Sequence, residues 1–299
     1  MAEMIQYNKC PCCSSAAIHF ALYCKDYVVS SETFELWHCE ACNFRFIQNA
    51  PPENKIGRYY DSEKYQSHSL DSNSLFNKMF QLARKYSVWW RCRLVLKASK
   101  KKHGELLDIG SGVGAFAHGI KQYGWHVTAL EPDEDARATA DTQYAVVAQP
   151  MGNLYKLSPK SFDIITLWHV LEHVHDIHDY LIQISQLLKD DGLLIIAVPN
   201  FLSVDAKYYK KFWDAYDVPR HLHHFSHTSL LKLASKYGFA ITAKKRFWLD
   251  AYFASLLSEE HKHGKKRWAS ATLQGLRSNL LSIADINKSS AITYIFKKR

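Results

Sequence analysis

The sequence predicts an α/β protein, with a doubly wound, mainly parallel sheet preceded by a small metal-binding ribbon. Two observations predict the sheet. Between residues 105 and 200, near-continuous apolar runs alternate with helical segments, which is typical of parallel strands covered on both faces. The first of these runs leads into a glycine-rich turn, Gly110 to Gly114. A third observation, two Cys-x-x-Cys pairs near the start, predicts the ribbon.

The composition is that of an ordinary globular protein. Hydrophobic residues make up 47% and charged residues 22% of the 299 residues, enough for a sizeable core. No apolar run reaches the roughly 18 residues that a membrane span needs. The start, Met-Ala-Glu-Met, lacks a basic-then-apolar signal region. We therefore expect a cytoplasmic protein without a membrane span, and the sequence leaves its oligomeric state open.

The net charge of +9 is unevenly distributed. Residues 54–104 hold 12 Lys/Arg against 3 Asp/Glu, and residues 244–299 hold 12 against 4. The stretch between them, residues 105–243, holds 11 against 16. Two basic arms thus flank a mildly acidic domain. They either attract an anionic substrate, a nucleic acid or a membrane surface, or they are solvated helix faces.

Residues 1–50 have the cysteine spacing of a zinc ribbon. The predicted ligands are Cys10, Cys13, Cys39 and Cys42, in two C-x-x-C knuckles. Four thiolates close a tetrahedral site around Zn²⁺, so we expect a structural rather than a catalytic metal. Cys12 and Cys24 lie outside this set. Short strands are predicted at 27–29 and 33–37.

Residues 51–104 form a linker and a helix. Tyrosines and a histidine between Tyr59 and Ser69 either line a pocket or belong to a linker packed on the core. From Ser74 onward apolar residues recur at helical spacing, and a basic last turn with Gly104 ends the helix. We expect this segment to pack over the cofactor cleft.

The stretch from 105 to 200 alternates strands and helices. The predicted strands are 106–109, 126–130, 145–148, 162–167 and 193–198, with helices at 115–123 and 177–188 and a turn at 189–192. Ligands of such sheets bind beyond the carboxyl ends of the strands. Gly110–Gly114, Glu131, Asn153, Trp168 and His169 all lie at or just past strand ends. We therefore expect them to converge on one site.

The glycine turn and Glu131 form a predicted nucleoside-binding half-site. Glycine adopts positive φ and has no Cβ, so a ligand is able to lie against this backbone. The following helix offers unpaired N–H groups. Glu131, after the second strand, is placed to bind a ribose diol. The pattern Gly110-x-Gly112-x-x-Ala115 also fits a dinucleotide dehydrogenase.

The last third of the chain adds two insertions to the sheet. Residues 201–226 are aromatic and polar, and they form either a substrate lid or a packing loop. In the lid interpretation, Arg220 pairs with an anionic group of the acceptor. The histidines at 221, 223 and 224 lack a nearby carboxylate or cysteine to complete a metal site. Beyond them we expect a helix at 229–237, a strand at 239–244, helices within 249–285 and a last strand at 291–296.

Leu106-Leu-Asp-Ile-Gly-Ser-Gly-Val-Gly114 resembles the first motif of class I S-adenosylmethionine-dependent methyltransferases. Phe162 to His173 and Asp191 to Pro199 are similar to the family's fourth and fifth strands with their turns. The resemblance implies a seven-stranded Rossmann-like sheet over residues 105–299, with insertions at 201–226 and 249–285, and S-adenosylmethionine as cofactor. The implied cofactor-binding residues are Asp108, Gly110, Ser111, Gly112, Gly114, Glu131, Pro132, Asn153, Leu154, Trp168 and His169.

The segment after the fourth strand bears on the methyl acceptor. Enzymes of the family that methylate exocyclic base amines usually carry Asn/Asp-Pro-Pro-Tyr there, whereas this chain has Trp168-His-Val-Leu171. The resemblance thus favours a small-molecule acceptor, methylated on oxygen or carbon, over RNA. RNA remains the alternative because of the ribbon and the basic arms, and an inactive cofactor-binding module is a further one. The candidate general bases are His169, His173 and His221, followed by His223.

Overall fold

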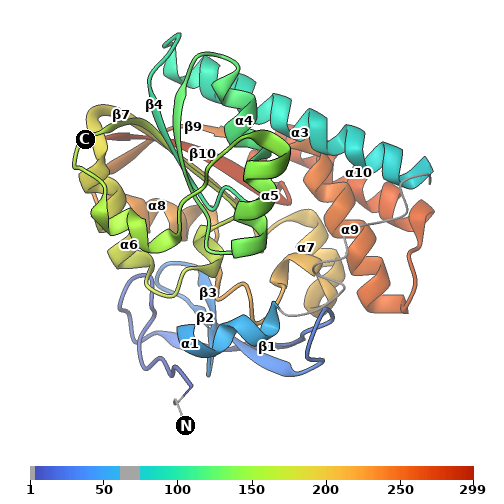
Figure 1. Ribbon diagram of the computed structural model, residues 1–299. Coiled ribbons are helices and arrows are strands. Elements are labelled where there is room, and N and C mark those ends of the chain that lie inside the picture. Colours follow the sequence, from blue (N-terminus) through green and yellow to red (C-terminus); the bar gives the residue numbers. More distant parts are fainter. Residues whose placement is uncertain (1–3, 61–74) are drawn as a thin grey trace.

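The computed structural model describes residues 4–60 and 75–299, with side chains in the second range from residue 81 onward. Its main element is a six-stranded sheet of order β5-β4-β6-β7-β10-β9 (Figure 1). The strands are β4 (Glu105–Ile109), β5 (His126–Leu130), β6 (Phe162–Trp168), β7 (Leu188–Pro199), β9 (Phe239–Lys245) and β10 (Ala291–Lys298). The first four strands in this order are parallel, and β10 runs antiparallel to both of its neighbours.

Helices cover both faces of this sheet. They are α3 (Leu75–Ser99), α4 (Ala115–Lys121), α5 (Glu134–Tyr144), α6 (Ile177–Leu187) and α8 (His227–Lys236). Leu107 and Ile165 belong to the apolar cluster shared with α6 and α8, whereas Leu106 and Ile164 belong to the one shared with α3 and α4. Burial on both faces explains the near-continuous apolar runs. The predicted doubly wound α/β fold is confirmed.

The seven-stranded sheet implied by the resemblance is not formed in the described part of the chain. The predicted strand at 145–148 is reduced to one parallel bridge, between Gln149 and Leu130. Ala145 caps α5 with a left-handed φ of 51°, and Pro150, which has no N–H to donate, ends the extended stretch. The predicted turn at 189–192 is also absent, because β7 continues through it with a bulge opposite 162–164.

The N-terminal ribbon is a sheet of order β1-β2-β3-β8, drawn in blue in Figure 1 except for β8. Its strands are β1 (Ile18–Lys25), β2 (Thr33–Cys39), β3 (Phe44–Gln48) and β8 (His223–His224). The strand predicted at 27–29 is wrong: these residues form a turn. The Asp26 carboxylate accepts the backbone N–H groups of Val28 and Ser30 at 2.9 and 2.8 Å, which favours the turn over a strand.

Residues 201–226 are packed against the ribbon. They form α7 (Val204–Tyr209), η4 (Lys210–Phe212), η5 (Asp214–Tyr216) and β8, which pairs antiparallel with β3. One apolar cluster combines Phe34, Leu36 and Ile47 of the ribbon, Tyr59 of η1 (Gly57–Tyr59), and Phe201, Tyr209, Trp213, Tyr216 and Leu222 of this segment. These aromatic side chains are therefore part of a core, as in the packing-loop interpretation.

The remaining elements lie around this frame. They are α1 (Glu53–Ile56), η2 (Met151–Lys156), η3 (Leu171–His173), α9 (Trp248–His263), α10 (Trp268–Ala284) and η6 (Ile286–Lys288). Helices α9 and α10 form a pair at the edge of the molecule (Figure 1). None of the described helices is both long and apolar enough to cross a membrane.

Candidate active site

The glycine turn lies at the carboxyl end of β4, next to the end of β5. Gly110 and Ser111 donate their N–H groups to the Leu130 carbonyl at 2.8 and 2.9 Å. Gly112 donates to the Glu131 carboxylate at 2.7 Å. The structure thus brings together the glycine turn and the acidic residue, as the sequence predicts.

The three glycines of the turn have positive φ but different surroundings. A Cβ at Gly110 would lie 2.5 Å from Val170, and one at Gly114 would lie 2.9 Å from Ala140. A Cβ at Gly112 would meet nothing within 4 Å, so its Cα faces open space. The buried Ser111 hydroxyl beside it has no hydrogen-bond partner among the described residues. These features fit a cofactor that lies against Gly112.

Glu131 is held in place by backbone groups. Its second oxygen accepts the Asp133 N–H at 3.1 Å, and Arg137 fixes its carbonyl at 2.9 Å. Burial raises the pKa of Glu131 above its ordinary value, while the two N–H groups act against this shift. Each oxygen keeps a lone pair for a ribose hydroxyl.

Asp108 lies below the turn and is 1% exposed. It accepts a hydrogen bond of 2.7 Å from Thr166 of β6. Burial raises its pKa to about 7, although Thr166 and Arg91 lower it. Asp108 therefore joins β4 to β6 directly beneath the proposed cofactor position.

The other predicted cofactor residues have mixed surroundings. Asn153 donates to the Gln149 side chain at 3.1 Å, and Leu154 is fully buried. Pro132 is exposed. Trp168 is buried against Phe116, with ring centroids 5.4 Å apart. Trp168 is thus a core residue at the end of β6.

His169 directly follows β6 and has an unusual backbone conformation. Its φ of 58° lies in the left-handed region, which is uncommon for a residue other than glycine. Its Nδ1 lies 3.3 Å from Glu172 Oε1. Burial lowers the pKa of His169, but the Glu172 carboxylate raises it by more, so it lies above the ordinary value.

Glu172 is the functional candidate that sequence reasoning missed. Its side chain is 1% exposed, and neither carboxylate oxygen has a hydrogen-bond partner among the described residues. Burial raises its pKa, but His169, His221 and His173 lower it by more, so Glu172 is ionised near neutral pH. The sequence feature that could have identified Glu172 is its position three residues after the candidate base His169.

His173 and His221 lie beside Glu172, with ring centroids 4.6 Å apart. One ligand-type atom each from Glu172, His173 and His221 lies within 4.8 Å of the others. The His173 Nδ1 is 3.0 Å from the Tyr60 hydroxyl, and the His221 Nδ1 is 2.9 Å from the Ala215 carbonyl. Burial and the nearby His221 lower the pKa of His173 to about 4. The three predicted general bases, His169, His173 and His221, thus all lie close to the Glu172 carboxylate.

His223 is separate from this cluster. It is buried in β8, where its ring lies 5.5 Å from that of Phe44. Burial lowers its pKa to about 4. His223 therefore belongs to the contact between the ribbon and the rest of the chain.

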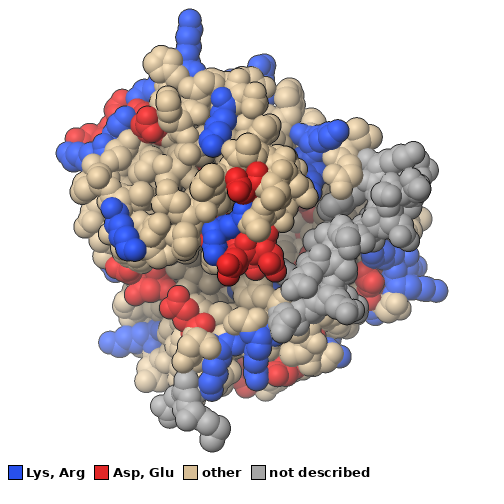
Figure 2. All heavy atoms as spheres, in the orientation of Figure 1, with Lys and Arg blue, Asp and Glu red and all other residues tan. Residues whose placement is uncertain are grey.

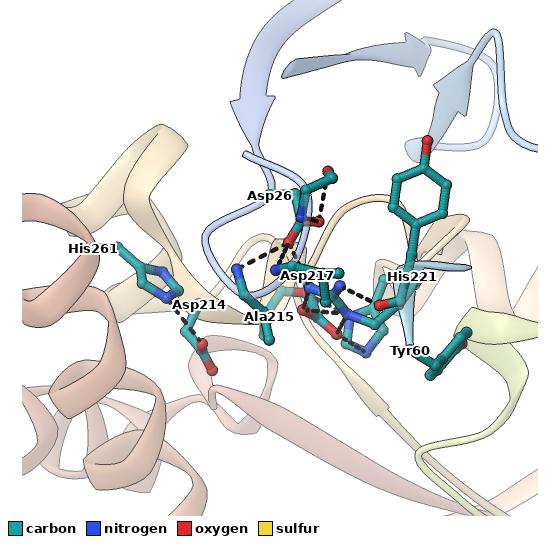
Figure 3. A network of polar contacts seen from close by, with 12 residues as sticks. Asp26, Tyr60, Asp214, Ala215, Asp217, His221 and His261 are labelled. Atoms are coloured by element: carbon teal, nitrogen blue, oxygen red, sulfur yellow. Dashed lines mark hydrogen bonds and ion pairs between the residues drawn. The ribbon is translucent and has the colours of Figure 1, made fainter. Parts of the chain in front are cut away.

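The expectation that Arg220 binds an anionic acceptor is wrong. Its side chain is fully buried, and Nη2 lies 3.0 Å from Asp26 and 2.6 Å from Asp217. Its Nη1 donates to the Tyr59 carbonyl at 2.8 Å. Figure 3 shows Asp26 of the ribbon and Asp217 of the 201–226 segment within one network of polar contacts. Arg220 therefore joins the ribbon, the linker and that segment.

The four predicted zinc ligands come together in the ribbon. The Sγ atoms of Cys10 and Cys42 lie 3.7 Å apart, as do those of Cys13 and Cys39, and all four lie within 4.8 Å of one another. A tetrahedral site with Zn–S bonds of about 2.3 Å places its sulfurs about 3.8 Å apart. The described thiols therefore fit a zinc ion.

Comparison with known proteins identifies the family. A family model described as a methyltransferase domain matches residues 81–244, more than half of the chain. The ubiquinone biosynthesis O-methyltransferase of Rhodopseudomonas palustris (strain HaA2) is 26% identical over 143 residues, which cover 40% of this chain and 56% of that protein. The one from Caulobacter vibrioides is 31% identical over 102 residues, covering 32% and 40%. The matched part thus spans about half the length of these curated relatives.

A solved structure has the same fold. The crystal structure of a SAM-dependent methyltransferase from Archaeoglobus fulgidus covers 75% of this chain and 98% of its own, with a TM-score of 0.51 and 21% identity. The matched family region contains the glycine turn, Glu131 and the histidine segment after β6. The chain belongs to the methyltransferase-domain family.

Proposed function

We propose that this protein is an S-adenosylmethionine-dependent methyltransferase that methylates an oxygen atom of a small-molecule acceptor, with His169 as the general base. The observation that carries the proposal is the pair of His169 and Glu172, 3.3 Å apart, at the carboxyl end of β6. His169 is one-third exposed, so its other ring nitrogen is accessible to an acceptor. The names of the curated relatives, which are O-methyltransferases, support oxygen as the methylated atom.

S-adenosylmethionine supplies a methyl group already activated on a sulfonium. Gly110 to Gly114 would hold its methionine part, Glu131 its ribose, and Asn153 and Leu154 its adenine. The chain must then align the acceptor and remove its proton. His169 Nε2 would take the hydroxyl proton as the oxygen attacks the methyl carbon. Glu172, ionised and buried beside Nδ1, would stabilise the imidazolium that results.

RNA is the alternative acceptor, favoured by the basic arms. The surroundings of the glycine turn favour a small molecule, because α5 begins there with Asp133, Glu134 and Asp135. Figure 2 shows acidic side chains gathered on this face over α5. Such charges repel a polyanion.

The test offers both acceptor classes to the enzyme. The protein is incubated with methyl-labelled cofactor and either a metabolite extract or total RNA. We expect label in a small molecule, with little dependence on salt. Label in RNA alone, falling steeply with salt, would overturn the proposal.

His169→Ala tests the base in the same assay. We expect the rate of transfer to fall by about 10²- to 10⁴-fold while cofactor affinity stays nearly constant. His126→Ala, at the opposite end of the sheet, is the matched control and should change neither quantity. Equal losses of rate and cofactor affinity in His169→Ala would make His169 a cofactor-pocket residue.

We further propose that Cys10, Cys13, Cys39 and Cys42 hold one structural Zn²⁺, which the 3.7 Å sulfur separations support. A ribbon this short has little core of its own, so the metal would stabilise its fold. Metal analysis should give about one equivalent, and Cys13→Ser should lose it. Cys24→Ser should retain the metal, because Cys24 lies in the core shared with residues 201–222. Loss of zinc in Cys24→Ser would refute this ligand set.

A further inference from the structure

Helix α10 has its apolar side chains on the outside. Its buried residues are small or polar: Ala271, Gln274, Gly275, Ser278, Asn279 and Ser282. Its exposed residues include five large aliphatic ones, between 42% and 69% exposed: Leu273, Leu276, Leu280, Leu281 and Ile283. Surface helices of globular proteins have the reverse pattern. We call these five residues the outer face of α10.

Packing fixes this orientation of α10. A Cβ at Gly275 would lie 2.6 Å from the Tyr252 ring of α9, so the two helices are in close contact. Ser278 donates to Asp205 of α7 at 2.8 Å, and Asn279 donates to the Trp248 carbonyl at 2.9 Å. Rotating α10 would bury its leucines only by breaking these contacts.

Helix α3 also exposes large apolar and aromatic side chains. They are Leu82, Tyr86 and Trp89, which we call the strip of α3. The Phe247 ring lies 5.7 Å from that of Tyr86, and the neighbouring Arg246 donates to the Ser282 carbonyl of α10. Residues 246–248 thus lie between α3 and α10.

Basic residues outnumber acidic ones around this surface, and Lys266 and Arg267 are paired with Glu260 and Glu259 of α9. Neither α3 nor α10 contains an acidic residue in its sequence. Lys85, Arg93 and Lys97 are exposed along α3, and Lys265 to Arg267 precede α10. Figure 2 shows Lys and Arg side chains gathered near the junction of α9 and α10. Two copies meeting through this surface would bring like charges together, so charge complementarity favours an anionic partner.

We propose that the outer face of α10 and the strip of α3 bind the surface of an anionic lipid bilayer. Helix α10 lies in the plane of the interface with its leucines in the acyl-chain boundary, as amphipathic interfacial helices do. Tyr86 and Trp89 lie at headgroup level, where aromatic side chains are favoured. Lys85, Arg93 and Lys97 of α3 and Lys265 before α10 contact lipid phosphates. This assigns a partner to the basic arms that methyl transfer leaves unexplained.

Vesicle flotation of the full-length protein tests the proposal. We expect binding to phosphatidylcholine vesicles with roughly one-third phosphatidylglycerol, and much weaker binding to phosphatidylcholine alone. Leu276→Gln combined with Leu280→Gln should weaken binding about tenfold or more, because both side chains leave water on insertion. Ile182→Gln removes a similarly exposed aliphatic side chain from α6 and should bind like the unaltered protein.

Charge-reversal variants test the electrostatic contribution to vesicle binding. Lys85→Glu with Arg93→Glu should weaken binding to the anionic vesicles about tenfold, and added salt should act in the same direction. Circular dichroism and cofactor affinity should match the unaltered protein in each variant, because all the altered residues are exposed. The absence of vesicle binding would overturn the proposal. So would a dimer in light scattering that the leucine changes dissociate, since a second copy would then cover the surface.

Discussion

The proposed cofactor half and the proposed acceptor half of the site are built in different ways. On the cofactor side, Gly112 and Glu131 are 19 residues apart and are joined through a backbone N–H. On the acceptor side, Tyr60 and His173 are 113 residues apart and meet through side chains. One strand-helix-strand unit, β4-α4-β5, makes the first half, whereas the second requires the linker, the segment after β6 and residues 201–226.

The two halves also differ in what sets their properties. Around Glu131, backbone donors and open space prepare a site whose shape depends little on ionisation. Around Glu172, three histidines and a buried carboxylate set one another's pKa, so the chemistry changes with pH. The comparison predicts that changes in one half leave the other intact.

The largest expected effect is the loss of cofactor binding in Gly112→Arg. The new side chain would occupy the open space in front of the turn, and the residue would retain a strained φ of 54°. We expect affinity for S-adenosylmethionine to fall about 100-fold or more in titration calorimetry. Gly264→Arg is the matched control, because Gly264 has a φ of 70° and open surroundings at the end of α9. Equal losses in both variants would contradict the assignment of the turn.

The next effect concerns the ribbon. Arg220→Met would leave the fully buried Asp26 carboxylate without its cation and would remove the ion pair of the partly buried Asp217. Removing one partner of a buried ion pair costs about 3–5 kcal/mol of unfolding free energy, measurable by urea denaturation. Lys160→Met, which removes the exposed ion pair with Asp190, should cause no measurable change. A stability loss that is equal in both variants would show that burial of Arg220 contributes nothing.

The contrast between local contacts and contacts between distant segments also explains which parts of the fold were predictable from the sequence. The parallel sheet was predictable because strands buried on both faces are apolar throughout, as β6 is. The strand at 27–29 was mispredicted because apolar and β-branched residues carried the signal, whereas the Asp26 side chain determines a turn there. The pairing of β8 with β3 was not predictable, since a two-residue strand has no periodicity.

In the candidate site, too, local patterns were predictable and contacts between distant residues were not. The glycine turn and Glu131 were predictable because their spacing along the chain encodes their geometry. Arg220 was misassigned because an arginine in an aromatic segment is equally consistent with a substrate ligand and with one partner of a buried ion pair. Its partner Asp26 lies 194 residues away, and no local pattern connects them.

A pH profile sharpens the assignment on the acceptor side. Glu172 raises the pKa of His169, and His169 must be neutral to accept a proton. Activity should therefore rise as pH increases through a pKa above 6.5. In Glu172→Gln that pKa falls, so the acid limb of the profile should move to lower pH while the maximal rate drops about 10- to 100-fold. A drop in rate with an unmoved acid limb would assign Glu172 a packing role alone.

The smallest expected effect is on stability and concerns Asp163, which lies at the opposite end of β6 from His169. Asp163 lies 2.7 Å from Lys101 and 2.9 Å from Lys189, and it accepts the Glu105 N–H at 2.9 Å. Burial raises the pKa of Asp163, but these partners lower it by more, to about 2. Because the folded pKa lies below the ordinary value of 3.8, the carboxylate stabilises the fold above about pH 4. This contribution is lost as pH falls from about 4 to about 2.

Asp163→Asn should therefore reduce the unfolding free energy by about 1–2 kcal/mol at pH 7, an estimate that allows for solvent screening of the two half-exposed lysines. The difference from the unaltered protein should shrink as pH falls from about 4 to about 2, because Asp163 is protonated in the unfolded chain before it is protonated in the folded one. Asp190→Asn removes the exposed carboxylate next to Lys160 and should leave stability unchanged. Methyl transfer should be unaffected in both variants at neutral pH, because this end of β6 lies away from the acceptor. A fall in methyl transfer by Asp163→Asn without loss of stability would show that the two ends of β6 are coupled.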